Sequence, residues 1–363
     1  MLARIIAPGS YRRGAGVIRA SGRALRSLGA RACLVGGHRA LAAAAPVLQD
    51  AMASAGVEPV GQVWYGGECC PENIAMVAAA IKEKGADFLV GVGGGKALDT
   101  AKGAAWQAGV PLVTVPTIAA TCAAFTSIAI IYDREGHFLA ISHEAANPFL
   151  VLVDSQIIAA APWRYLAAGM GDTLAKYIEL RATSTAVSPH LALEGALGLA
   201  RLCYDSILAA GPGARAAVEN QVVTPDLEKV IDAVILISGL VSGLGGDDGR
   251  TAGAHGIYEG LTASPLTRGC CHGELVAFGN LVQLFLEGRE TKAIKHLAAF
   301  NRQVGLPITL AEVGLSPEDE PSLDLISRAA AESPDMANMP FPVTAAMIKE
   351  ALLAADRLGQ ELA

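Results

Sequence analysis

Apolar and polar positions follow different periods in the two halves of the chain. The first half alternates short apolar runs of strand length with amphipathic stretches of helix length. Strands are expected over 32–35, 60–65, 87–90, 112–115 and 149–153, a hairpin over 127–132 and 137–141, and helices over 39–54, 72–85 and from Lys96 or Ala97 onward. Strands separated by helices of this length predict a parallel sheet with helices on both faces.

After residue 160 the pattern becomes helical. Long stretches rich in alanine and leucine run to the end of the chain with almost no strand signal. Gly211-Pro212-Gly213, Gly243–Gly249 and Gly305-Leu306-Pro307 are expected to interrupt the helices. We therefore predict an α/β domain over residues 1–160 and an all-helical domain over residues 161–363.

Composition excludes several classes of partner. The chain is 52% hydrophobic and 17% charged, with a net charge of −7, which disfavours nucleic acid or an anionic membrane surface as a partner. Gly103–Tyr132 carries no charge, but its prolines and polar residues would break a membrane-spanning helix. The seven cysteines form no CxxC pair, which favours a reducing compartment, so a cytoplasmic protein is expected.

One glycine-rich stretch favours phosphate binding. Gly91-Val92-Gly93-Gly94-Gly95-Lys96 follows a predicted strand and opens a predicted helix, whose free N–H groups would face an anion. It is neither GxGxxG, since Lys96 holds the last glycine position, nor a P-loop, since Ala97 follows the lysine. The alternative is a tight turn between strand and helix that binds nothing.

A carboxylate and two histidines are candidate metal ligands. Asp172 lies in an apolar, glycine-flanked stretch, where a carboxylate needs a partner or a metal. His255 and His272 lie among small residues and are 17 positions apart. Three such ligands leave a position open, as a catalytic zinc site requires, and they also suit non-haem iron. The alternative is a buried Asp172–Lys176 pair with ordinary core histidines.

Taken together, these motifs resemble a known family. They are Gly91–Lys96 with Asp99–Lys102, Pro116–Ala119, Gly169–Asp172, His255 with Gly260–Thr262, and His272–Glu274 with Val276–Gly279. In this order they resemble the glycerol dehydrogenase branch of the iron-containing (group III) alcohol dehydrogenases. The resemblance implies a Rossmann-like N-terminal domain, a helical C-terminal domain and an active site in the cleft between them.

The resemblance also implies site residues and cofactors. Asp172, His255 and His272 would bind one divalent metal, with zinc favoured over iron, and NAD or NADP would be the second cofactor. The implied cofactor-binding residues are Gly94 and Gly95 at the pyrophosphate, Lys96 and Asp99 beside the cofactor, and Thr117, Ala120, Thr126, Ile128 and Tyr132 on the nicotinamide side.

Three positions depart from the glycerol dehydrogenase pattern. Cys122 replaces an aspartate near the substrate hydroxyls, and Arg250 replaces a small residue. His38, followed by Arg39, replaces the aspartate at the adenosine ribose, so NADPH should be accepted at least as well as NADH. The changes at Cys122 and Arg250 resemble hydroxycarboxylate dehydrogenases, which reduce 2-oxo acids.

We therefore expect a metal-dependent NAD(P) dehydrogenase that interconverts a 2-hydroxy acid and a 2-oxo acid. His255, Arg250 and Cys122 are the expected catalytic residues. Its partner would be a small-molecule substrate, and the chain would form a homo-oligomer. The alternatives are a glycerol dehydrogenase that forms dihydroxyacetone, a lyase like dehydroquinate synthase, and a non-catalytic nucleotide-binding protein.

Overall fold

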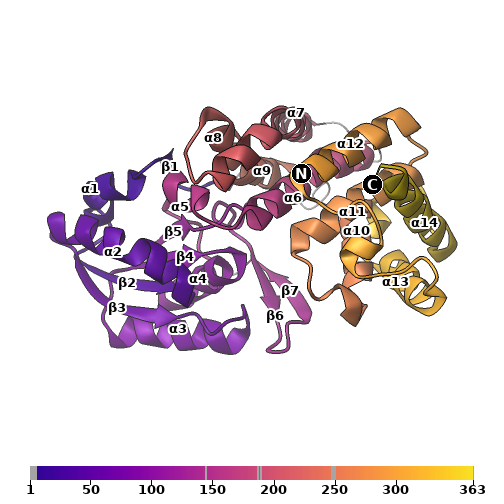
Figure 1. Cartoon of the computed structure of the whole chain (residues 1–363). Coiled ribbons are helices and arrows are strands. Elements are labelled where there is room, and N and C mark those ends of the chain that lie inside the picture. The colour runs from indigo at the N-terminus through magenta and orange to yellow at the C-terminus, as the bar shows by residue number, and fades with distance from the viewer. Residues whose placement is uncertain (1–5, 144, 186–187, 189, 247–250, 363) are drawn as a thin grey trace. The chain divides into compact units, whose positions relative to one another are not determined.

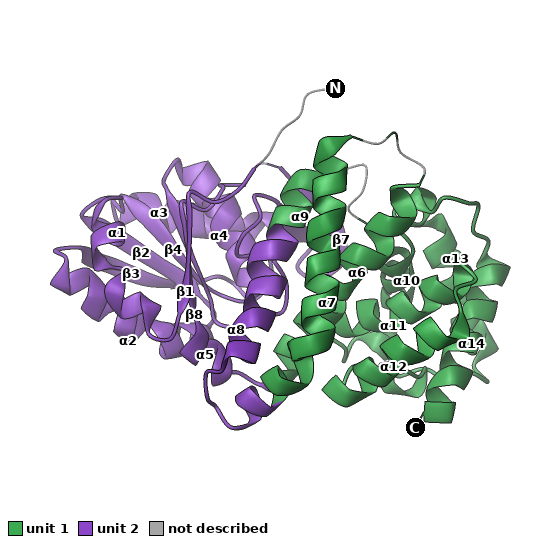
Figure 2. Ribbon diagram, turned by 90° about the horizontal axis from the view of Figure 1, so that it is seen from above, with its two compact units in different colours: residues 1–4, 163–215, 240–363 green, residues 5–162, 216–239 purple. Residues whose placement is uncertain are grey.

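The computed structural model describes residues 6–143, 145–185, 188, 190–246 and 251–362. The chain divides into two compact units, coloured separately in Figure 2: unit 2 contains residues 5–162 and 216–239, and unit 1 contains residues 1–4, 163–215 and 240–363. Unit 2 thus includes a segment from beyond residue 160. The expected domains, 1–160 and 161–363, stay a prediction, because a compact unit need not be an independent domain.

Unit 2 is built on a six-stranded parallel sheet (Figure 1). The strands lie in the order β1-β8-β5-β4-β2-β3, and every neighbouring pair is parallel. They are β1 (Ser10–Gly14), β2 (Arg31–Gly36), β3 (Glu58–Trp64), β4 (Phe88–Gly93), β5 (Leu112–Pro116) and β8 (Leu150–Asp154). The predicted parallel sheet is confirmed.

Helices cover both faces of this sheet. The helices of unit 2 are η1 (Val17–Ala20), α1 (Gly22–Arg26), α2 (His38–Ser54), α3 (Pro71–Glu83), α4 (Gly95–Ala108), α5 (Ser155–Ala159), α8 (Pro225–Asp232) and the π-helical η2 (Ala233–Ile237). Val90 and Val92 of β4 pack in one core with α1 and α2, whereas Leu89 packs in a second core with α3 and α4. This alternation follows from the two-residue period of a strand and explains its continuous apolar run.

The order of the strands reverses direction between β2 and β4. From β2 the chain passes to β3 on one side and then crosses to β4 on the other side of β2. In parallel α/β sheets, ligands bind at the carboxyl ends of strands where the order reverses in this way. The Gly36–His38 turn and the Gly93–Lys96 turn therefore lie at this point.

The pattern of apolar positions did not predict β1, which forms one edge of the sheet. Its residues are polar, and the reason lies in a distant partner: Arg13 pairs with Glu228 at 2.5 Å and Asp232 at 2.8 Å, while Tyr11 donates to Asp232 at 2.8 Å. The acidic partners lie on α8, beyond residue 220. A charged edge strand of this kind has no apolar alternation to detect.

The predicted hairpin is present as β6 (Ala129–Tyr132) and β7 (Phe138–Ser142), an antiparallel pair separate from the main sheet. Its turn is closed by Asp133, which accepts from the backbone N–H of His137 at 2.7 Å.

The described part of unit 1 contains helices and no strand, which confirms the predicted helical C-terminal region. Its elements are α6 (Trp163–Thr183), α7 (Leu191–Glu219), α9 (Ser238–Gly245), α10 (Gly253–Thr262), η3 (Pro265–Thr267), α11 (His272–Leu286), α12 (Thr291–Val304), η4 (Ala311–Val313), α13 (Glu320–Glu332), η5 (Met336–Asn338) and α14 (Ala345–Leu362). The C-terminal end of α7 and the start of α9 extend into unit 2. Among the described residues, no helix has the length and apolarity to cross a membrane.

One predicted helix break is wrong. α7 continues through Gly211-Pro212-Gly213. An interior proline costs about 3 kcal/mol through a lost hydrogen bond and a clash with the preceding turn. The adjacent Gly211 lets Phe300 approach so closely that a Cβ would lie 2.8 Å from its ring. This packing favours the continuous helix over the break that Pro212 indicated. The predicted break at Gly305 is confirmed, since this residue ends α12 in the left-handed conformation with φ of 74°.

Candidate functional site

Unit 1 brings one carboxylate and two imidazoles together. Asp172 lies in the middle of α6, His255 in the first turn of α10 and His272 at the start of α11. The Nε2 atoms of His272 and His255 lie 3.3 Å and 3.5 Å from Oδ1 of Asp172. One candidate ligand atom from each residue lies within 4.8 Å of the others. The residues singled out as metal ligands therefore form one cluster.

The spacing of these atoms fits a divalent cation. A tetrahedral site with ligand bonds of about 2.0–2.1 Å has edges of roughly 3.3–3.4 Å, close to the two N···O separations. Asp172 and His255 are buried, whereas the side chain of His272 is 35% exposed. Three donors with one accessible side are the arrangement that a catalytic metal requires.

Two glycines explain why α6 and α11 can approach each other so closely. A Cβ on Gly171 would lie 2.4 Å from the carbonyl oxygen of Gly273, and one on Gly273 would lie 1.9 Å from the carbonyl oxygen of Ala168. The two helices therefore pack backbone against backbone. Because Asp172 follows Gly171 and His272 precedes Gly273, this contact brings both candidate ligands together.

An ion pair fixes the start of α11. Arg164 on α6 pairs with Glu274 at 2.5 Å and donates to the carbonyl oxygen of Gly269 at 2.6 Å. Glu274 also accepts from the backbone N–H of Cys271 at 2.6 Å, as in a capping box. The backbone is therefore held on both sides of His272, at Gly269 and Cys271 before it and at Glu274 after it.

A second carboxylate lies behind His255. Glu179 is fully buried on α6 and accepts from Nδ1 of His255 at 2.8 Å. It also accepts from the backbone N–H groups of His255 at 2.9 Å and Ala252 at 2.8 Å. When Nδ1 donates to Glu179, the lone pair of Nε2 is available on the side of Asp172, where a metal would need it.

The charges of the cluster follow from burial and its local compensation. Burial alone would raise the pKa of Asp172, but Lys176 and the two histidines hold that pKa well below its usual range. Burial likewise opposes the charge on Glu179, whose pKa is lowered by His255. For His255, burial lowers the pKa, but Glu179 and Asp172 raise it to about 10. A cation that binds through Nε2 must therefore displace a proton from His255.

In unit 2, the glycine turn joins β4 to α4. Gly94 is the N-cap of α4 and Gly95 its first residue. A Cβ on Gly94 would lie 2.7 Å from Cδ1 of Ile118, whereas one on Gly95 would lie 3.7 Å from Oγ1 of Thr121, an ordinary contact distance. The turn leads directly into the N-terminus of a 14-residue helix, the arrangement that binds anions in other proteins. Thr117 lies close by, because its N–H donates to the carbonyl oxygen of Gly93 at 3.1 Å.

Lys96 is held in place by a residue that the sequence did not indicate. Its Nζ lies 2.5 Å from Oε2 of Glu68 and 5.6 Å from the ring centroid of Tyr132. Two predicted cofactor residues, Lys96 and Tyr132, are therefore neighbours. Glu68 follows two glycines in the loop after β3, and no pattern there marks it.

A buried ion pair organises the segment after β5. Lys102 is fully buried, and its Nζ lies 2.7 Å from Oδ1 of Asp99. The same ammonium donates to the carbonyl oxygen of Ile128 and, at 3.4 Å, to the hydroxyl of Thr126. Asp99 also accepts from the N–H of Ile130 at 3.0 Å. Three predicted cofactor residues, Asp99, Thr126 and Ile128, thus share one network around Lys102.

The remaining predicted residues lie on loops or at helix ends. Ala120 and Cys122 are half-buried in the segment between β5 and β6. His38 opens α2 at the exposed carboxyl end of β2 and stacks on Trp64, with ring centroids 5.6 Å apart. Arg250 lies outside the described residues.

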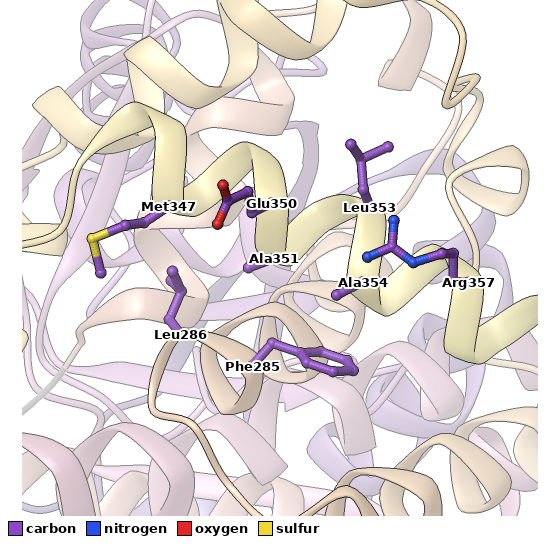
Figure 3. Close-up of a pocket in the computed structure, with 8 residues that line it drawn as sticks. All are labelled: Phe285, Leu286, Met347, Glu350, Ala351, Leu353, Ala354 and Arg357. Carbon is purple, nitrogen blue, oxygen red and sulfur yellow. The ribbon is translucent and has the colours of Figure 1, made fainter.

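The structure also has a surface groove of about 440 Å³ beside α11 and α14 (Figure 3). Its lining residues are Phe285, Leu286, Met347, Glu350, Ala351, Leu353, Ala354 and Arg357. None of the predicted site residues lines it. Its size suits a small ligand, but the candidate chemistry lies at the metal cluster and the glycine turn instead.

Comparison with known proteins identifies the family. The family model of iron-containing alcohol dehydrogenases matches residues 8–155. A glycerol dehydrogenase of Escherichia coli O6:H1 (strain CFT073) is 40% identical over 363 residues, covering 98% of each chain. The chain belongs to the iron-containing alcohol dehydrogenase family, in its glycerol dehydrogenase branch. This iron-containing alcohol dehydrogenase is thus an enzyme of the glycerol dehydrogenase type, an oxidoreductase that acts on a CH–OH group.

Two further relatives carry names that indicate different substrates. The crystal structure of a probable glycerol dehydrogenase from Sinorhizobium meliloti 1021 superposes with a TM-score of 0.87 at 34% identity, covering 99% of this alcohol dehydrogenase and 100% of that chain. The hydroxycarboxylate dehydrogenase A of Escherichia coli (strain K12) is 38% identical over 301 residues, covering 82% of this chain and 81% of its own. The resemblance derived from the motifs is confirmed.

The close contact between α6 and α11 in this alcohol dehydrogenase gives a testable expectation. Gly273→Ala places a Cβ against the backbone of Ala168 and should cost about 1–3 kcal/mol of stability. It should also weaken zinc binding, because His272 moves away from Asp172. Urea unfolding and zinc titration of the metal-free protein measure the two effects.

Gly269→Ala is the matched control, because a Cβ there meets nothing within 4 Å and the carbonyl oxygen that accepts from Arg164 is retained. Equal stability and zinc affinity in both variants would show that close packing of the helices does not position His272.

Proposed function

We propose that this enzyme is a metal-dependent dehydrogenase that transfers hydride between NAD(P) and a small 2-hydroxy acid or its 2-oxo acid. The observation that supports it is the cluster of Asp172, His255 and His272, in which both imidazole Nε2 atoms face one carboxylate oxygen. A divalent cation there, for which we propose zinc, would lower the pKa of a substrate hydroxyl and polarise a carbonyl in the reverse reaction. A bound nicotinamide would accept the hydride from the alcohol or donate it to the carbonyl.

Groups of the protein would bind and orient the dinucleotide. The N–H groups at Gly94 and Gly95 would receive the pyrophosphate at the N-terminus of α4. Lys96, which Glu68 holds, would add positive charge beside it. His38 and Arg39 are both exposed at the end of β2. With no carboxylate at these two positions to repel a 2′-phosphate, NADPH should serve at least as well as NADH.

The substrate class is inferred from two sequence positions. Cys122 is neutral where an aspartate would repel a substrate carboxylate, and Arg250 is a candidate to hold that carboxylate with two parallel hydrogen bonds. A relative named hydroxycarboxylate dehydrogenase A is 38% identical to this chain. These observations favour an oxo acid as the substrate.

The second candidate is the interconversion of glycerol and dihydroxyacetone. It is supported by relatives named glycerol dehydrogenase, one of which is 40% identical over nearly the full length. The two candidates share the metal, the cofactor and the transfer of a hydride between nicotinamide and a carbinol carbon, and they differ in the group beside the reacting carbon.

A substrate panel separates the two. We expect kcat/KM for 2-oxobutanoate or 2-oxoglutarate to exceed that for dihydroxyacetone, measured with NADH and with NADPH. Arg250→Ala should lower oxo acid turnover by about tenfold to several hundredfold, because each charged hydrogen bond contributes about 1.5–3 kcal/mol.

Cys122→Asp should act against oxo acids in the same assay, since it adds a negative charge, whereas Cys122→Ser controls for loss of the thiol. If dihydroxyacetone is the best substrate, or if Arg250→Ala leaves oxo acid rates unchanged, the glycerol assignment replaces this one. Elemental analysis of the purified protein tests the choice of zinc over iron.

A further inference from the structure

Glu179 accepts more hydrogen bonds than the single one that would orient the ring of His255. It accepts three hydrogen bonds, from the ring of His255 and from the backbone N–H groups of Ala252 and His255. All three donors lie in the first turn of α10 or immediately before it. The carboxylate itself comes from α6, the helix that also carries Asp172.

The backbone contacts have a specific reason. α10 begins after Ala252, which has no side chain that could cap the helix. The first N–H groups of a helix have no partner within it and need one from elsewhere. Oε1 of Glu179 accepts from two of these groups, and Oε1 of Gln283 on α11 accepts from the N–H of Ala254 at 2.7 Å. Two buried side chains from other helices thus replace the missing cap.

We propose that Glu179 is a positioning residue that caps α10 through one oxygen and fixes the ring of His255 for metal binding through the other. This inference rests on the proposed function, in that it takes His255 as a metal ligand. It assigns to one carboxylate both the start of the helix and the tautomer of the ligand that the helix carries.

The two roles separate in Glu179→Gln. A glutamine has one acceptor oxygen, which can replace Oε1 and still accept from Ala252 and His255. Its NH₂ group then faces Nδ1 and can only donate, which favours the tautomer with hydrogen on Nε2. That tautomer cannot bind a metal through Nε2. If the side-chain amide is rotated by 180°, its NH₂ group faces two backbone donors and the cap is lost.

The test compares two measurements on the metal-free full-length protein. One is the dissociation constant for Zn²⁺, from competition with a chelator of known affinity, and the other is Tm. Glu179→Gln should weaken Zn²⁺ binding by about 10- to 100-fold with a small change in Tm, whereas Glu179→Ala should lower both affinity and Tm.

Gln283→Met is the matched control, because Gln283 caps the same helix, and its described hydrogen bonds join it to Ala254, Ile178 and Glu287 rather than to either histidine ring. It should lower Tm and leave Zn²⁺ affinity within about twofold, well below the loss expected for a metal partner. Wild-type Zn²⁺ affinity in Glu179→Gln, or an equal loss in Gln283→Met, would overturn the positioning role.

Asp172→Ala separates this inference from the proposed function. If Asp172→Ala binds Zn²⁺ as tightly as the wild type, the metal site itself is wrong. If Asp172→Ala loses Zn²⁺ and Glu179→Gln retains it, the metal site stands and only the role of Glu179 fails.

Discussion

Replacing His272 by alanine is expected to lower kcat/KM by about a thousandfold or more. His272 is one of three candidate ligands, and two protein ligands hold a catalytic metal poorly. The charge stabilisation that a metal supplies is several kcal/mol, and about 4 kcal/mol corresponds to a thousandfold in rate. Steady-state kinetics and the metal content of the purified variant measure the effect. Chelation of the wild type should give the same loss, and added Zn²⁺ should reverse it.

The binding of dinucleotide should survive this change. The glycine turn at Gly94 and Gly95 belongs to unit 2, whereas His272 belongs to unit 1. NADH binding, measured by calorimetry, should therefore remain near that of the wild type. His296→Ala is the control, since His296 is exposed on α12. Full activity in protein freed of metal would contradict the assignment.

Predictions from sequence succeeded where local chemistry was sufficient. β4 and β8 are apolar on both faces, so their strands were evident before the structure. Asp172 could be singled out as a candidate ligand, because a carboxylate in an apolar helix needs a partner, although a pair with Lys176 was an equal alternative. The sequence did not show that Asp172, His255 and His272 lie together, because this depends on a backbone contact between Gly171 and Gly273, which are far apart in the chain. The family resemblance supplied what spacing alone left open.

Residues that support the candidate site were harder to predict. Glu179 lies two helical turns after Asp172 on the same face of α6, a spacing that could have marked it. Lys102 follows Asp99 by one helical turn, a spacing that is typical of exposed ion pairs on a helix surface. Only the structure shows that Lys102 is fully buried. Glu68 has no detectable signal, because its partner Lys96 lies at the start of α4, 28 residues further along the chain.

Lys102→Met should destabilise the protein by about 3–5 kcal/mol, because it leaves the carboxylate of Asp99 buried without its ammonium partner. Asp99 would retain the N–H of Ile130, at 3.0 Å, as a donor. NADH binding should also weaken, since Lys102 holds Ile128 and Thr126, which are predicted to line the nicotinamide side. Urea unfolding and calorimetry measure the two losses.

The pH dependence of this loss identifies its origin. Burial raises the pKa of Asp99, and Lys102 opposes the rise. In Lys102→Met the pKa of Asp99 should rise further, so the folded variant takes up a proton that the unfolded chain releases. A raised carboxyl pKa costs stability as pH rises from the unfolded value of about 3.9 through the folded value. The difference from the wild type should therefore grow as the pH rises above about 3.9 and level off once the pH exceeds the folded pKa of Asp99 in the variant.

The double variant Asp99→Leu/Lys102→Met separates charge burial from positioning. Replacing both members of a buried ion pair by apolar residues is often neutral or stabilising, so the double variant should recover most of the stability that the single variant loses. It should not recover NADH affinity, because the carbonyl oxygen of Ile128 and the N–H of Ile130 still lack their partners. A single variant as stable as the wild type at every pH would show that the pair contributes nothing to the fold. Recovery of both properties in the double variant would show that Lys102 balances the charge of Asp99 and does not position the segment after β5.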